Sequence, residues 1–190
     1  MIGYELEAYG ELAAGIERVL ITQEQIEAKT RELGEVISRD YRGKNPLLVG
    51  VLKGVVPFMA DLLRAITIPV EVDFIDITRF QPSSAQHGAV RLEKDLNEPI
   101  EGRHVLFVED VIDTGMTLNY LLAQLHVREP ASLEVCTCFN KLTHRLVDIP
   151  VRYKGFDLPD MFVVGYGLDY REQYRNLPFV GLLRVEVFQK

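Results

Sequence analysis

The sequence predicts an α/β fold built on a parallel sheet. Strand-like apolar runs alternate with helix-like segments through residues 47–139, and this alternation is typical of parallel α/β sheets. The chain has 190 residues, of which 47% are hydrophobic, and this suits one domain with a sizeable core. After Pro150 the sequence is loop-rich, and we expect it to form a smaller lobe over one edge of the sheet.

The first expected elements are a helix over residues 22–41 and a strand over residues 45–52. Thr22 and Gln25 have the spacing of a capping box, and apolar residues follow at helical spacing. The run Leu47-Leu48-Val49-Gly50-Val51-Leu52 is compact and apolar, which is typical of a buried strand. This helix and strand open the α/β pattern.

The next segments continue the alternation. Pro57 suits the first turn of a helix over residues 57–66, and residues 70–80 alternate between apolar and polar. Residues 81–88 have loop composition, and we expect a mobile loop there. The remaining expected elements are strands at 90–96, 105–108 and 133–139, a helix at 115–127, and short strands at 162–164 and 179–183.

Composition excludes several classes of protein. A net charge of -7 disfavours nucleic acid as a partner, because its phosphates require a basic face. Cys136 and Cys138 are too close along a strand to bridge, and they lack further residues at metal-ligand spacing. We see neither a signal-peptide pattern nor an apolar run of membrane-spanning length. We therefore expect a cytoplasmic protein without a membrane partner.

Residues 105–118 carry the clearest chemical signal. An apolar run meets Glu109 and Asp110, a short turn follows, and a helix then begins. In open α/β sheets, ligands bind beyond the carboxyl ends of the strands. Unpaired amides at a helix start favour phosphate, and Gly115 lets the backbone approach closely. Acids for a sugar diol and a turn for a phosphate together fit a ribose phosphate, although an acid at this place is also a common helix cap.

The stretch from Glu109 to Thr117 resembles the phosphoribosyl pyrophosphate signature of type I phosphoribosyltransferases. Further segments resemble hypoxanthine-guanine phosphoribosyltransferases in family order over residues 44–184. These segments are Val51-Leu52-Lys53-Gly54, Val72-Asp73-Phe74-Ile75, Asn140-Lys141, Tyr153-Lys154-Gly155-Phe156, and Phe162-Val163-Val164-Gly165-Tyr166-Gly167-Leu168-Asp169-Tyr170.

The resemblance implies an architecture. It predicts a doubly wound parallel sheet of about five strands flanked by helices. It also implies that residues 1–190 form a single phosphoribosyltransferase domain. The core would comprise about residues 44–150, and a small hood would come from the N-terminal segment and about residues 150–190. A homodimer or homotetramer is expected on the same ground.

The resemblance also implies roles for individual residues. Asp113 would be the catalytic general base, and a non-proline cis peptide would enter Lys53. The ribose and 5′-phosphate would be bound by Glu109, Asp110, Asp113, Thr114, Gly115, Met116, Thr117 and Leu118. Pyrophosphate would be bound by Lys53, Gly54 and Arg175, and the purine by Lys141, Phe162 and Val163. The expected cofactor is Mg²⁺, held near Asp169, Glu109 and Asp110.

The function that this resemblance implies is purine salvage. The 5-phosphoribosyl group of phosphoribosyl pyrophosphate would pass to hypoxanthine, guanine or both, giving IMP or GMP and pyrophosphate. A xanthine-preferring enzyme and a nucleotide-sensing regulator on the same fold are the alternatives. The mobile loop of the family usually begins with Ser-Tyr, whereas this chain has Arg79-Phe80, and this keeps the regulator open.

Overall fold

The main sheet of the protein contains six strands. The structure is a computed structural model that describes residues 6–79 and 90–188. The strand order is β4-β3-β2-β5-β6-β7. Their bounds are β2 Leu47–Val51, β3 Glu71–Arg79, β4 Val90–Lys94, β5 His104–Ile112, β6 Ser132–Asn140 and β7 Tyr153–Asp157.

Five of these strands are parallel to one another. β2 pairs with β3 and β5, β5 pairs with β6, and β6 pairs with β7, all in parallel. β4 runs antiparallel to β3 at the edge of the sheet. The predicted five-stranded parallel sheet is therefore confirmed, and the strand expected over residues 90–96 adds a sixth member.

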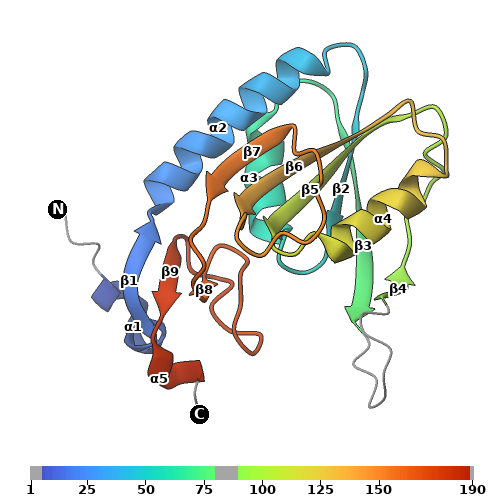
Figure 1. Cartoon of the computed structure of the whole chain (residues 1–190). Helices are drawn as coiled ribbons and strands as arrows, with labels where there is room; N and C mark the ends of the chain where they lie inside the picture. Colours follow the sequence, from blue (N-terminus) through green and yellow to red (C-terminus); the bar gives the residue numbers. More distant parts are fainter. Residues whose placement is uncertain (1–5, 80–89, 189–190) are drawn as a thin grey trace, which may run out of the picture.

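Helices cover both faces of this sheet (Figure 1). α2 (Gln23–Asp40) and α3 (Val56–Ala65) pack on one face, where their apolar residues share a core with β2, β5 and β6. α4 (Met116–His126) packs on the other face. Neighbouring strand residues such as Leu48 and Val49 belong to opposite cores, as the two-residue period of a strand requires. The sheet is thus doubly wound.

The predicted start of α2 is confirmed in detail. The Thr22 hydroxyl accepts a hydrogen bond from the Gln25 amide at 3.3 Å, and the Gln25 side chain accepts one from the Thr22 amide at 2.8 Å. Each bond satisfies an amide that has no partner inside the helix. Pro57 lies in the first turn of α3, as expected.

The two ends of the described chain form a second sheet. Its three strands are β1 (Ile16–Ile21), β9 (Val180–Leu183) and β8 (Val163–Val164), in the order β1-β9-β8, with both pairings antiparallel. It has its own apolar cluster, to which Ile16 and Phe179 belong. The short elements η1 (Leu6–Tyr9), α1 (Gly10–Ala14) and α5 (Val185–Phe188) lie near it (Figure 1). Whether this part acts as a hood over a substrate stays a prediction.

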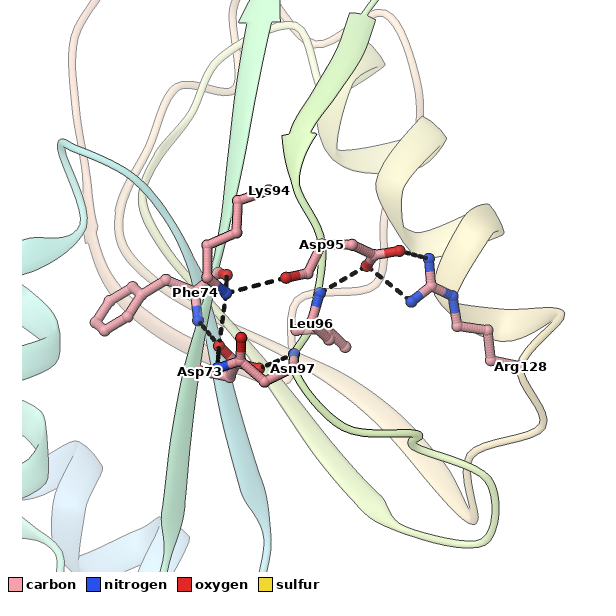
Figure 2. A network of polar contacts seen from close by, with 7 residues as sticks. All are labelled: Asp73, Phe74, Lys94, Asp95, Leu96, Asn97 and Arg128. Atoms are coloured by element: carbon pink, nitrogen blue, oxygen red, sulfur yellow. Dashed lines mark hydrogen bonds and ion pairs between the residues drawn. The ribbon is translucent and has the colours of Figure 1, made fainter.

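A polar network fixes the edge of the main sheet (Figure 2). Lys94 Nζ donates to Asp73 Oδ1 at 2.9 Å, and the Asn97 amide donates to Asp73 Oδ2 at 2.6 Å. Arg128 binds both oxygens of Asp95 at 2.8 Å. These bonds join β3, β4 and the segment that follows α4.

Three expectations concern the surroundings of this core. Cys136 and Cys138 are buried and unbridged in β6, as expected. Within the described residues, no helix is both long and apolar enough to span a membrane. The loop expected at 81–88 and Phe80 lie outside the described residues, so the expected effect of Arg79-Phe80 stays a prediction.

Candidate active site

A cleft of about 560 Å³ lies at the carboxyl ends of β2 and β5. It is formed by the segment after β2, the turn between β5 and α4, and the segment that precedes β9. Most of the predicted site residues line it: Lys53, Gly54, Glu109, Asp110, Asp113, Thr114, Gly115, Thr117, Leu118, Asp169 and Arg175. Residues far apart in sequence thus meet where the sheet topology predicts a ligand.

A second hollow of about 200 Å³ adjoins this cleft. Lys141 and Val163, both predicted to bind purine, line it. Asp110, Asp113, Asp169 and Arg175 line both spaces, so the two are neighbours. Hereafter we call them the main cleft and the side pocket.

Two predicted residues do not line either space. Met116 begins α4 and is 53% exposed. Phe162 is 43% exposed and meets Tyr170 edge to face, with ring centroids 5.7 Å apart. This exposure argues against a core role for Phe162, which is the ordinary role of an aromatic residue.

The two acids lie inside β5 and not after it. Pairing with β6 continues past Glu109, which faces Thr137, to Ile112, which faces Asn140. The apolar run predicted a strand only over residues 105–108, because polar residues usually mark a strand end. Here β6 supplies the pairing that extends the strand, so the acids are held on a rigid element.

Asp110 is held tightly at its position in β5. Burial raises the pKa of its carboxyl group, against the opposing effects of a 2.7 Å hydrogen bond from the Val111 amide and the nearby Arg175 charge. A Cβ atom added to Gly54 would overlap Asp110 Oδ2. Gly54 is therefore required by the close approach of backbone to carboxylate.

Two cationic side chains, Lys53 and Arg175, also line the main cleft. The peptide bond entering Lys53 is cis, as the resemblance predicted. Lys53 Nζ lies 3.0 Å from Glu172 Oε2, and Arg175 lies 2.8 Å from Asp169 and 3.2 Å from Glu172. Glu172 was not predicted from the sequence. Its pKa is lowered by the hydrogen bond from Lys53 first and by Arg175 next.

The turn between β5 and α4 has the geometry expected of an anion site. Gly115 has a left-handed backbone, with φ of 81°, and its missing side chain leaves the helix start uncapped by the residue itself. The Thr114 carbonyl accepts hydrogen bonds from the amides of Leu146 and Val147 at 2.9 and 3.3 Å. The turn is thus anchored from behind, while Thr114 and Thr117 line the main cleft.

Lys141 lines the side pocket. Its amide donates to the Ile112 carbonyl at 2.9 Å, which fixes the backbone beside β5. Its Nζ donates to the Met161 carbonyl at 3.1 Å. A cation with spare donors at the edge of a pocket suits an oxo group of a ligand.

The histidine at position 144 was assigned no role from the sequence, yet it touches the predicted base. Its Nδ1 lies 3.1 Å from Asp113 Oδ1, and its Nε2 lies 2.9 Å from Asp160 Oδ1. The three residues come from three different loops. Local sequence patterns carry no signal for such a contact.

The acids present suit a weakly held Mg²⁺. Among residues 6–79 and 90–188, no three His, Cys, Asp or Glu side chains are grouped to hold a metal. Mg²⁺ commonly takes one or two carboxylates and completes its shell with water and substrate phosphates. Glu109, Asp110 and Asp169 on the walls of the main cleft fit that mode.

Comparisons with known proteins agree with this geometry. The family model of the phosphoribosyl transferase domain matches residues 20–171. A hypoxanthine-guanine phosphoribosyltransferase from Streptococcus agalactiae is 50% identical over 92% of this chain and 97% of its own length. A hypoxanthine phosphoribosyltransferase from Staphylococcus aureus has a TM-score of 0.90 at 41% identity, covering 94% of this chain and 97% of that one. A Trypanosoma cruzi hypoxanthine phosphoribosyltransferase has a TM-score of 0.86 at 38% identity over 92% and 94% of the chains.

The fold and the two adjoining spaces define a phosphoribosyltransferase, a glycosyltransferase that uses a ribose phosphate donor. The relatives cover nearly the whole chain at high identity. The chain belongs to the hypoxanthine-guanine phosphoribosyltransferases, the purine-salvage branch of this family.

Proposed function

We propose that this enzyme transfers the 5-phosphoribosyl group from phosphoribosyl pyrophosphate to hypoxanthine, guanine or both, and releases pyrophosphate. The observation that carries the proposal is that Asp113 lines both the main cleft and the side pocket. A donor in the cleft and a base in the pocket would meet at this carboxylate. The relatives that match this chain are named for the same activity.

The donor fits the main cleft in one orientation. Its pyrophosphate would lie against Lys53, Gly54 and Arg175, because these supply the positive charge and the open backbone. Its ribose hydroxyls would donate to Glu109 and Asp110. The turn formed by Asp113, Thr114, Gly115, Met116, Thr117 and Leu118 would receive the 5′-phosphate on its amides and hydroxyls.

The base fits the side pocket. Lys141 would turn from the Met161 carbonyl to donate to the 6-oxo group. Phe162 is sufficiently exposed to stack on the ring, and the backbone of Val163 would meet the exocyclic edge. A 6-amino group in place of the oxo group would present donors to a donor, which disfavours adenine.

The carboxylates of the main cleft would hold Mg²⁺ together with the substrate. Asp169 lies beside Arg175, where the pyrophosphate would bind, while Glu109 and Asp110 line the part of the cleft that would hold the ribose. When bound, Mg²⁺ neutralises charge on the leaving pyrophosphate.

The transfer itself needs one proton acceptor. The N–H proton of the attacking purine nitrogen passes to a carboxylate oxygen of Asp113. The nitrogen lone pair forms the bond to the anomeric carbon, and the C–O bond to pyrophosphate breaks with its electrons leaving on the pyrophosphate. Correct orientation in two adjoining spaces lowers the entropic cost of this step.

The assembly and location of the enzyme are part of the proposal. We expect a homodimer or homotetramer, and one related structure was studied for the role of its C-terminal region in oligomeric state. We expect the enzyme to act in the cytoplasm on small molecules, without nucleic acid or membrane partners.

Pyrophosphate release tests the proposal. The enzyme is supplied with phosphoribosyl pyrophosphate and Mg²⁺, with hypoxanthine, guanine, xanthine or adenine in separate reactions. We expect turnover with the first two bases and none when Mg²⁺ is withheld. Preference for xanthine would assign the alternative substrate. Tight donor binding without turnover on any base would instead favour a regulator.

A further inference from the structure

We propose that Tyr170 is a positioning residue for Phe162 and thereby sets the affinity of the side pocket for the purine. The inference rests on the proposed function and deepens it, because it concerns how the base would be held. It starts from the edge-to-face contact of the two rings, whose centroids lie 5.7 Å apart with an interplanar angle of 88°. Neither the sequence pattern nor the family resemblance assigned a role to Tyr170.

The ring of Phe162 benefits from being fixed before the base arrives. Phe162 is 43% exposed, and an exposed side chain loses conformational freedom when a ligand immobilises it. A contact that orients the ring beforehand removes part of this entropic cost. Tyr170 provides such a contact, because aromatic rings that meet edge to face have a preferred geometry.

Tyr170 is itself held in place. Its amide donates to the Gln173 carbonyl at 3.2 Å, and its carbonyl accepts from the Gln173 amide at 3.0 Å, so it lies at the base of a tight hairpin. Its ring packs against the apolar cluster of the three-stranded sheet. The Arg171 guanidinium lies 5.1 Å from the ring centroid, within the range of a cation–π contact. The three-stranded sheet thus supports Phe162 through Tyr170.

The ring pair joins two segments that line the side pocket. Val163, next to Phe162 in the chain, and Asp169, next to Tyr170, both line this pocket. Phe162 precedes β8, whereas Tyr170 lies between β8 and β9. Loss of the ring contact should therefore loosen the purine site and leave the 5′-phosphate turn after β5 intact.

Two substitutions of Tyr170 separate the ring from its hydroxyl group. We expect Tyr170→Leu to raise the KM for hypoxanthine about 3- to 10-fold, which is the contribution of an aromatic pair. Tyr170→Phe should keep the wild-type KM, because it retains the ring. In both variants kcat and the KM for phosphoribosyl pyrophosphate should stay within about twofold, since Tyr170 does not line the main cleft. An unchanged KM for hypoxanthine in Tyr170→Leu would overturn the inference.

A double-mutant cycle determines whether Tyr170 acts through Phe162. Phe162→Leu is made alone and together with Tyr170→Leu, and the KM for hypoxanthine is measured in all four proteins. Once Phe162 is replaced, Tyr170→Leu should add less than about a twofold change, because the contact is already lost. Two fully additive losses would mean that Tyr170 acts on the base by another route.

A second aromatic pair supplies the matched control. Tyr9 and Phe179 also meet edge to face, with centroids 5.1 Å apart, and belong to the same apolar cluster. Neither of them lines the main cleft or the side pocket. Tyr9→Leu should therefore leave the KM for hypoxanthine unchanged. An equal rise in Tyr9→Leu and Tyr170→Leu would attribute the effect to general loosening of the three-stranded sheet and would refute positioning.

An NMR measurement on the wild type depends on neither turnover nor a Tyr170 variant. The ring signals of Phe162 are assigned by their loss in Phe162→Leu, and nuclear Overhauser cross-peaks to the Tyr170 ring are then sought. We expect such cross-peaks, because the two rings are in contact. Their absence would refute the inference even in an active enzyme. An inactive wild type that shows them would instead refute the proposed function alone.

Discussion

Asp113 is the residue on which the proposed chemistry depends most directly. We predict that Asp113→Asn lowers kcat by about 100-fold or more, because the amide no longer accepts a proton in the transition state. The affinity for phosphoribosyl pyrophosphate should change little, since the side chain keeps its shape. Single-turnover kinetics measure the loss in rate, and calorimetry measures the affinity for phosphoribosyl pyrophosphate. Equal kcat in variant and wild type would contradict the assignment of the base.

Lys141 is expected to act on the purine alone. We predict that Lys141→Ala raises the KM for hypoxanthine by about 10- to 100-fold, the loss expected for a hydrogen bond from a charged donor. The KM for phosphoribosyl pyrophosphate should stay unchanged, because Lys141 lines the side pocket only. Steady-state kinetics with each substrate varied separately measure both values. A change confined to the donor would argue against the proposed base site.

Gly54 tests how closely the walls of the main cleft must approach. A methyl group at this position would overlap the Asp110 carboxylate. The overlap must displace Asp110 or the backbone beside Lys53, and a displacement of about 1 Å can cost about 100-fold in rate. We therefore predict that Gly54→Ala loses about that much in kcat/KM for phosphoribosyl pyrophosphate, as measured by initial rates.

Gly43 offers a matched control for this substitution. An added Cβ would meet nothing within 4 Å there, although φ is 78°. Gly43→Ala should therefore lose about 1–2 kcal/mol of stability from its left-handed backbone and keep its activity per folded molecule. Full activity in Gly54→Ala would show that the close approach is dispensable.

The residues that sequence reasoning found and missed differ in a physical way. Asp113 and Gly115 belong to one continuous stretch, in which the sequence pattern indicates a strand, a turn and the start of a helix. His144 and Glu172 act through side chains that meet partners more than 30 residues away. Such contacts depend on how loops return to the sheet, and neighbouring residues do not encode that return.

At the scale of elements, the segment between β8 and β9 contains a carboxylate, Glu172, that partly neutralises the proposed pyrophosphate site. Glu172 pairs with Lys53 and Arg175, the two cations proposed to bind pyrophosphate. The donor must displace this carboxylate. We predict that Glu172→Gln strengthens donor binding about two- to fivefold, the scale of an exposed ion pair. Calorimetry with phosphoribosyl pyrophosphate and Mg²⁺ measures the change.

Salt separates this effect from a general change in net charge. The gain in Glu172→Gln should shrink as ionic strength rises, since exposed charges are screened. Glu32→Gln changes the net charge equally, but it lies on α2 with Lys29 as its partner. It should leave donor affinity unchanged. Equal gains in both variants would attribute the effect to net charge.

Some elements could be predicted because their signals are local. The capping box of α2 involves residues three apart and was legible in the sequence. β7 was not expected, because Gly155 usually weakens a strand. In the fold, an added Cβ on Gly155 would overlap the Cys138 carbonyl, so this glycine permits the approach of β6. β1 was also not expected, and its partner β9 lies at the other end of the chain.

At the scale of the molecule, the alternation of elements was sufficient to predict the parallel sheet. In a βαβ unit, a short right-handed crossover brings each strand beside the next one. The three-stranded sheet follows no such rule. Its strands β1 and β9 pair with each other, although all strands of the main sheet lie between them in the sequence. The short strands expected at 162–164 and 179–183 are confirmed as β8 and β9, but their pairing with β1 in a second sheet was not predicted, because it depends on the finished core.

The edge of the main sheet provides a global test of stability (Figure 2). Asp73 is 8% exposed, and burial tends to raise the pKa of its carboxyl group. Hydrogen bonds from Asn97, Lys94 and Phe74 outweigh burial and lower that pKa. We predict that Asp73→Asn costs about 1.5–3 kcal/mol at pH 7, the contribution of hydrogen bonds to a charged group. Chemical denaturation measures the loss.

The sign of the pH dependence follows from the lowered pKa. A carboxyl group with a lowered folded pKa stabilises the fold above its unfolded value of about 3.9, and the contribution is lost as pH falls through the folded pKa. The difference between wild type and Asp73→Asn should therefore shrink as pH falls below about 4. The stability of Glu32→Gln, a change at an exposed ion pair, should stay within about 0.5 kcal/mol of the wild type both at pH 7 and below about pH 4. A difference for Asp73→Asn that persisted undiminished at low pH would mean that shape, and not charge, holds this edge.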